Sequence, residues 1–221
     1  IYHNVNFSRA IQCLKEKPGR YAIIGLPCQL TSIDLFLSKE ENQGIKERCF
    51  LKISLVCGYS FERNNLLALA AWYNTAFETI TYRNGGRYRS FRFVSTDGSV
   101  QEYVAHPADN CRSLLAQNIA FDRFHAQNGC LWCVDHLGYC ADIVVGDVWL
   151  ARFRSDAQGV NIILIRTKLG EEIIQTVKGI DLTPGNLQDI IESQGVYAKG
   201  EIGEGMRRWR EDSVFVPVHI R

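Results

Sequence analysis

The sequence lacks the features that mark several large classes of protein. Its net charge is only +1, so neither a nucleic-acid partner nor a membrane-surface partner is expected. No apolar run reaches the roughly 18 residues that a membrane-spanning helix needs, and the longest, such as Ile162–Ile165, have the length of a strand. Internal repeats and low-complexity stretches are also missing. The 46% of hydrophobic residues and 22% of charged residues are typical of a globular protein.

An initiating methionine and a signal peptide are lacking as well, since the chain opens with Ile1. We therefore expect a piece of a longer protein. Cysteine is too unevenly placed for a disulfide framework: of eight cysteines, three lie between Cys130 and Cys140 and the others are scattered. In a cytoplasmic chain this pattern favours metal binding over disulfides.

The hydrophobic periodicity predicts an α/β fold. It indicates helices at 7–17, 28–38, 62–73, 109–125, 169–178 and 185–193, and strands at 20–26, 49–57, 78–84, 89–105, 142–149 and 160–166. The Asp97-Gly98 pair between two alternating runs predicts a β-hairpin. We expect a mixed, partly parallel sheet flanked by helices, with a β-hairpin insertion and a cysteine-rich loop. Residues 1–195 are interpreted as the core and 196–221 as a tail.

The spacing Cys130-x2-Cys133-x6-Cys140 predicts a metal or cluster site, because a C-x2-C pair can place two sulfurs on one tight loop. A cubane iron–sulfur cluster needs a fourth ligand. Cys57 is the first candidate, since it ends an apolar strand and precedes Gly58.

A structural zinc ion is the alternative to a cluster, and His125 or His136 could complete its tetrahedral site. The spacing alone leaves the two open. Three of the remaining cysteines, Cys13, Cys49 and Cys111, are predicted to be packing residues rather than ligands.

Two further segments could meet a ligand. Gly25, Pro27, Cys28 and Gln29 join a strand to a helix, whose first turn can bind an anion and lower the pKa of a cysteine thiol. The alternative is a plain turn with a buried thiol. Gly146-Asp147-Val148-Trp149 ends another strand, where Asp147 could accept a hydrogen bond from a cofactor and Trp149 could stack on a flat ring. An ordinary strand exit would look the same.

Taken in order, these motifs resemble the beta-subunit family of coenzyme F420 hydrogenases and dehydrogenases. The likeness runs from about residue 20 to about residue 178. It is carried by the segments Gly25-Leu26-Pro27-Cys28-Gln29, Leu55-Val56-Cys57-Gly58, Tyr82-Arg83-Asn84-Gly85-Gly86, Cys130-x2-Cys133, Cys140-Ala141-Asp142-Ile143 and Gly146-Asp147-x-Trp149.

The resemblance implies an iron–sulfur flavoprotein oxidoreductase with a [4Fe–4S] cluster and FAD. It implies cluster ligation by Cys57, Cys130, Cys133 and Cys140, with the segment from Gly25 to Gln29 close to the flavin or the cluster. The expected partners are a redox protein or a ferredoxin-like domain, and a small-molecule hydride acceptor such as coenzyme F420. Longer family members carry a preceding segment that contributes to the flavin site.

Overall fold

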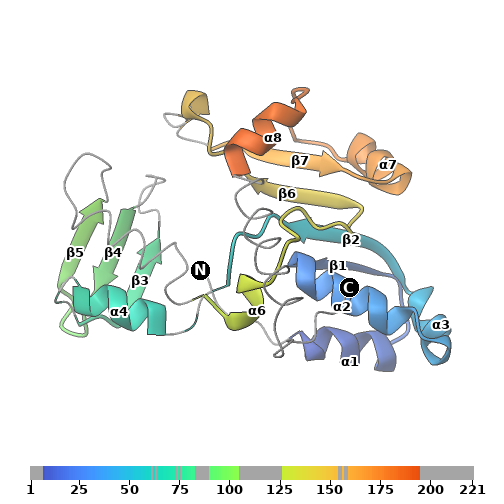
Figure 1. The fold of residues 1–221 in the computed structure, drawn as a ribbon, viewed down its shortest axis with the longest axis horizontal. Coiled ribbons are helices and arrows are strands. Elements are labelled where there is room, and N and C mark those ends of the chain that lie inside the picture. The colour runs from blue at the N-terminus through green and yellow to red at the C-terminus, as the bar shows by residue number, and fades with distance from the viewer. Residues whose placement is uncertain are drawn as a thin grey trace, which may run out of the picture. The chain divides into compact units, whose positions relative to one another are not determined.

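The computed structural model describes residues 7–60, 62, 64–72, 74, 76–82, 90–104, 126–153, 156 and 159–194 (Figure 1). These residues belong to two compact units, one within residues 59–131 and the other within residues 5–58 and 132–221. The assignment of residues 1–195 to one core stays a prediction. The predicted helix at 109–125, the Tyr82–Gly86 segment apart from Tyr82, and the tail at 196–221 lie outside the described residues.

The larger unit is built on a four-stranded sheet in the order β1-β2-β6-β7 (Figure 1). Strands β1, β2 and β6 are parallel, and β7 is antiparallel to β6. The elements of this unit are α1 (Ser8–Glu16), β1 (Tyr21–Gly25), α2 (Pro27–Leu37), η1 (Glu40–Asn42), α3 (Gln43–Lys46), β2 (Cys49–Leu55), β6 (Ile143–Asp147), η4 (Ala151–Phe153), β7 (Asn161–Ile165), α7 (Lys168–Thr176) and α8 (Leu187–Gln194).

Helices cover both faces of this sheet. Leu14 of α1 and Leu30 and Ile33 of α2 are buried in one cluster with Ile23 of β1 and Val144 of β6. Ile143 points to the opposite face, because successive strand residues alternate. Gly170 of α7 lies against it: a Cβ there would stand 3.1 Å from Ile143 and 2.5 Å from the Asp142 carbonyl oxygen. Helices α1 and α2 therefore share one face, and α7 covers part of the other.

The smaller unit carries a three-stranded antiparallel sheet in the order β3-β4-β5. The turn between β4 and β5 contains Gly98 at φ +80°, and the Asp97 carboxylate accepts a 2.8 Å hydrogen bond from the Ser99 backbone N–H. Phe93 is fully buried, with its ring centroid 5.3 Å from that of Phe77. The elements of this unit are α4 (Asn64–Trp72), β3 (Thr79–Tyr82), β4 (Ser90–Val94), β5 (Val100–Val104) and α6 (Asn128–Leu131).

The predicted fold class is confirmed, because the first sheet is mixed and flanked by helices and the second forms a β-hairpin insertion. In the part of the chain that the structure describes, no helix is long and apolar enough to cross a membrane.

Candidate functional site

The carboxyl ends of three adjacent parallel strands bring several predicted site residues to one edge of the sheet. Strand β1 ends at Gly25 and leads into α2, β2 ends two residues before Cys57, and β6 ends at Asp147. Since β2 lies between β1 and β6, these segments are neighbours at that edge. The crevice outside the carboxyl ends of parallel strands is where α/β sheets bind ligands.

Residues 133–140, called the cysteine segment below, lie alongside strand β2. The backbone N–H of Cys57 donates a 3.1 Å hydrogen bond to the carbonyl oxygen of His136. Gly138, at φ +61°, packs so closely on Ser54 that a Cβ would stand 2.4 Å from the serine side chain. The segment that holds Cys133 and Cys140 is thus placed directly beside the strand that leads to Cys57.

The turn inside this segment is held from two sides. The Asp135 carboxylate accepts hydrogen bonds from the backbone N–H groups of Leu137 (3.2 Å), Gly138 (2.7 Å) and Tyr139 (3.1 Å). The Arg166 guanidinium, just after β7, donates to the Leu137 carbonyl oxygen and lies 5.1 Å from the centre of the Tyr139 ring. The chain's own side chains therefore fix the conformation of the turn.

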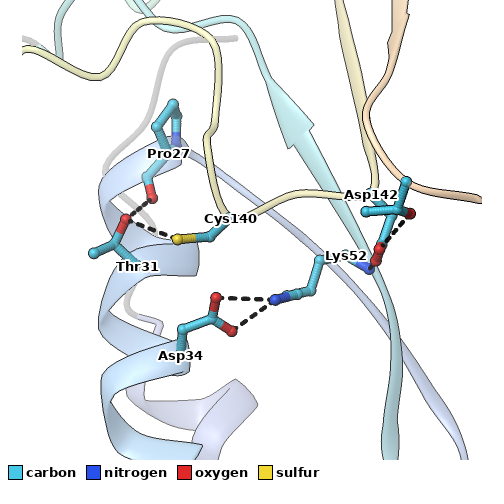
Figure 2. Close-up of polar contacts among 7 residues, drawn as sticks. Pro27, Thr31, Asp34, Lys52, Cys140 and Asp142 are labelled. Atoms are coloured by element: carbon cyan, nitrogen blue, oxygen red, sulfur yellow. Dashed lines mark hydrogen bonds and ion pairs between the residues drawn. The ribbon is translucent and has the colours of Figure 1, made fainter. Parts of the chain in front are cut away.

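Cys140 faces helix α2 and meets a polar group there (Figure 2). Its Sγ lies 3.8 Å from Oγ1 of Thr31, which donates to the Pro27 carbonyl oxygen at 3.1 Å. Asp34 and Lys52 form an ion pair beside it, with Nζ 2.8 and 2.9 Å from the two carboxylate oxygens. Burial raises the pKa of the Cys140 thiol, Thr31 lowers it by hydrogen bonding, and Asp34 raises it.

The thiols of Cys133 and Cys130 have different partners. The Cys133 thiol donates to the Asp135 carbonyl oxygen at 3.4 Å. In the smaller unit, Cys130 Sγ accepts a 3.3 Å hydrogen bond from the backbone N–H of Ser60. Such a donor stabilises a sulfur atom that carries negative charge, as in a thiolate or a metal ligand.

The donor set fits an iron–sulfur cluster in its chemistry. A [4Fe–4S] cluster takes four cysteine thiolates, and none of the seven described cysteines forms a disulfide. Within the described ranges, however, no three His, Cys, Asp or Glu side chains are grouped closely enough to hold a metal ion. The fit therefore rests on ligand type, on the Ser60 donor and on the loop contact between Cys57 and His136.

The first turn of α2 leaves less room and fewer hydrogen-bond donors for a ligand than the sequence predicts. Gly25 is buried, and a Cβ there would lie 3.2 Å from Phe7 and 3.3 Å from Leu30, so neighbouring side chains of the chain itself fill the space beside it. The Gln29 side chain accepts a 2.8 Å hydrogen bond from the backbone N–H of Leu26. Pro27 has no N–H to offer an anion.

Cys28, in contrast, is exposed in that first turn rather than buried. At the end of β6, the Asp147 carbonyl oxygen accepts hydrogen bonds from Gln194 and Ser193 of α8. The backbone N–H of Trp149 donates to Ser193 Oγ at 2.8 Å. Helix α8 thus holds the backbone on both sides of Val148.

The other cysteines and histidines have mixed outcomes. Cys49 is half-buried against the core, which confirms its predicted packing role, but the same prediction for Cys13 is wrong because Cys13 is exposed. Residue 13 lies on the outward face of α1, one position before the buried Leu14. Cys111 and His125 lie outside the described residues. His136 is buried.

Sequence reasoning missed the residues around Cys140, namely Thr31, Asp34 and Lys52. One signal was present: Lys52 interrupts the apolar run of β2, and a lysine at the centre of a strand inside a sheet needs a partner. Asp34 and Thr31 lie one turn apart on α2. Their partners become apparent only when α2 packs on β2.

Comparison with known proteins assigns the family. Residues 19–185 match the family model for the C terminus of the coenzyme F420 hydrogenase/dehydrogenase beta subunit. The chain belongs to this family. It is therefore related to the beta subunits of oxidoreductases, as the sequence motifs predicted.

A solved structure has the same fold. A chain from the xenon-derivatised F420-reducing [NiFe] hydrogenase complex of Methanosarcina barkeri matches with a TM-score of 0.58 and 17% sequence identity. The match covers 95% of the present chain and 69% of that chain. Comparison with the curated proteins finds no match.

Proposed function

We propose that this chain is the cluster-bearing part of an iron–sulfur flavoprotein oxidoreductase that passes electrons between a [4Fe–4S] cluster, FAD and a hydride-accepting partner such as coenzyme F420. Family membership supports the reaction class. The observation that carries the proposal is the hydrogen bond from Cys57 to His136, because it joins the candidate fourth ligand to the cysteine segment.

The proposed cluster ligands are Cys57, Cys130, Cys133 and Cys140. Cys57, Cys133 and Cys140 are supported by the contacts of their loops in the larger unit, and Cys130 by its two-residue spacing from Cys133 and by the Ser60 donor. A cluster moves single electrons and a flavin exchanges hydride, so the pair interconverts the two kinds of transfer. This chain would bind, orient and electrostatically adjust both groups.

The residues proposed for the flavin site are Gly25, Pro27, Cys28, Gln29, Asp147 and Trp149. Their support is topological: they lie at or just after the carboxyl ends of β1 and β6, on either side of β2. Because the side chains of Phe7, Leu30 and Gln29 fill the space beside Gly25, we assign that glycine to packing beneath the site. Exposed Cys28 is the residue of this turn best placed to meet a ligand.

A ferredoxin-like domain or a separate redox protein is the proposed electron partner. The proposed location is the cytoplasm, where thiols remain reduced and available as ligands. Both assignments follow from the cluster, so a chain without iron would remove their basis.

The direct test is a ligand series in the full chain, expressed and purified without oxygen. Cys57→Ser, Cys133→Ser and Cys140→Ser should each lose most of the bound iron, since serine is a poor ligand for a cluster. Cys13→Ser is the matched control, because Cys13 is an exposed cysteine on α1, and it should keep the iron of the wild-type chain.

Two results would count against the proposal. Full iron content in Cys57→Ser would remove Cys57 from the ligand set and make Cys28 or Cys111 the candidate. Zinc as the only stoichiometric metal would replace the redox function by a structural zinc site.

A further inference from the structure

An ion pair stands next to Cys140, one of the proposed ligands. Lys52 comes from β2 and Asp34 from α2, and both are close to Cys140 (Figure 2). Their side chains are only 23% and 33% exposed, so water and salt screen their charges less than those of a surface pair. The charge of Asp34 raises the pKa of the Cys140 thiol, and the charge of Lys52 lowers it.

We infer that Asp34 and Lys52 form a charge-balanced positioning pair for Cys140, which holds α2 against β2 and sets the reduction potential of the group that Cys140 binds. This inference rests on the proposed function. Neither residue is a ligand in this inference. Lys52 donates two hydrogen bonds to the Asp34 carboxylate, so the ammonium balances the negative charge of the carboxylate beside the sulfur.

The geometry makes the pair more than a surface contact. The backbone of Lys52 is bonded twice to Asp142, two residues after Cys140, and its side chain is bonded to α2. Thr31, one turn before Asp34, contacts the Cys140 sulfur. A single lysine therefore ties the strand, the cysteine segment and the helix that faces the cysteine.

The electrostatic sign gives the inference a distinctive consequence. Reduction adds negative charge, so an unbalanced carboxylate nearby disfavours it and an unbalanced ammonium favours it. Lys52→Met leaves Asp34 unbalanced and should lower the reduction potential. Asp34→Asn leaves Lys52 unbalanced and should raise it. The double variant Asp34→Asn/Lys52→Met restores neutrality and should return the potential close to that of the wild-type chain.

The experiment is a redox titration of the anaerobically purified full chain, followed by electron paramagnetic resonance, with iron counted in every sample. Lys52→Arg keeps the charge and should keep the potential. Lys46→Met is the matched control, because Lys46 is an exposed lysine of α3 in the same unit and its loss is the same change of charge. It should shift the potential less than Lys52→Met.

The outcomes separate this inference from the proposed function. A wild-type chain without a cluster overturns the proposed function and, with it, this inference. A wild-type chain with a cluster leaves the proposed function standing, and the variants then decide. Shifts of the same sign in Lys52→Met and Asp34→Asn, or unchanged potentials in both, would each overturn the role of the pair. Loss of iron from folded Lys52→Arg, which keeps the charge, would overturn it as well.

Discussion

Lys52 and Asp142 exchange two hydrogen bonds: the Lys52 backbone N–H donates to the Asp142 carboxylate at 2.8 Å, and the Asp142 backbone N–H donates to the Lys52 carbonyl oxygen at 2.8 Å. The second carboxylate oxygen accepts a 2.8 Å hydrogen bond from the Thr167 hydroxyl, at the start of α7. Asp142 therefore links β2, the end of the cysteine segment and the helix on the far face of the sheet.

Replacing this carboxylate should destabilise the larger unit. In Asp142→Ala the part-buried Lys52 N–H and the exposed Thr167 hydroxyl lose their acceptor, and we expect a loss of about 1–3 kcal/mol in the free energy of unfolding. Urea denaturation of the metal-free chain measures it. Asp181→Ala, at an exposed position between α7 and α8, is the control and should change the midpoint little. An Asp142→Ala midpoint equal to that of the control would contradict this role.

The close contact of Gly138 with Ser54 should make the cysteine segment intolerant of a side chain. Gly138→Ala places a Cβ at 2.4 Å from Ser54 and requires a left-handed backbone at φ +61°. We expect the free energy of unfolding to fall by about 1–3 kcal/mol and the chain to retain iron less well. Gly129→Ala is the matched control, since a Cβ there meets nothing within 4 Å. Equal thermal midpoints for the two variants would show that the contact is unimportant.

The Thr31 hydroxyl should influence the sulfur of Cys140. A hydroxyl has one proton, which Thr31 donates to the Pro27 carbonyl oxygen, so a protonated Cys140 is the donor to Thr31. Once the thiol proton is lost, the hydroxyl can turn and donate to the sulfur. Thr31→Val removes this donor and should lower the reduction potential of the loaded chain. Thr31→Ser keeps the donor, and its reduction potential should stay close to that of the wild-type chain. Equal potentials for the two variants would contradict a role of the Thr31 hydroxyl.

Cys49 should make stability depend on alkaline pH. Burial raises its pKa above the ordinary value of 9.0, and Asp34 and Asp142 add to this, while Lys52 opposes it. The folded chain then keeps the proton to higher pH than the unfolded chain, so the free energy of unfolding falls as pH rises through about 9. Denaturation between about pH 8 and 10 should show a shallower fall in Cys49→Ala than in Cys13→Ala. Parallel slopes would contradict the assignment.

The order of the main elements follows from periodicity, because each apolar run is long enough to identify its own strand or helix. Leu30, Ile33 and Leu37 mark the inner face of α2 in the sequence and are buried in the structure. The parallel strands follow from the helices between them. The α/β class therefore needs no tertiary information.

The surroundings of Cys140 could not be predicted in the same way. The contacts among Asp34, Lys52 and Cys140 join segments far apart in the chain, and they depend on how α2 lies across β2. The occupied first turn of α2 shows the same limit, since the Gln29 side chain folds back onto Leu26. The residue types indicated Cys140 as a candidate ligand. Only the packing of α2 on β2 identifies Asp34 and Lys52 as the charged residues beside it.

Iron and acid-labile sulfide analysis of the anaerobically purified full chain tests the central claim most directly. The account predicts a brown protein with about four irons and four sulfides per chain, and a signal that appears on reduction. A colourless chain with stoichiometric zinc, or one with neither iron nor sulfide, would contradict it.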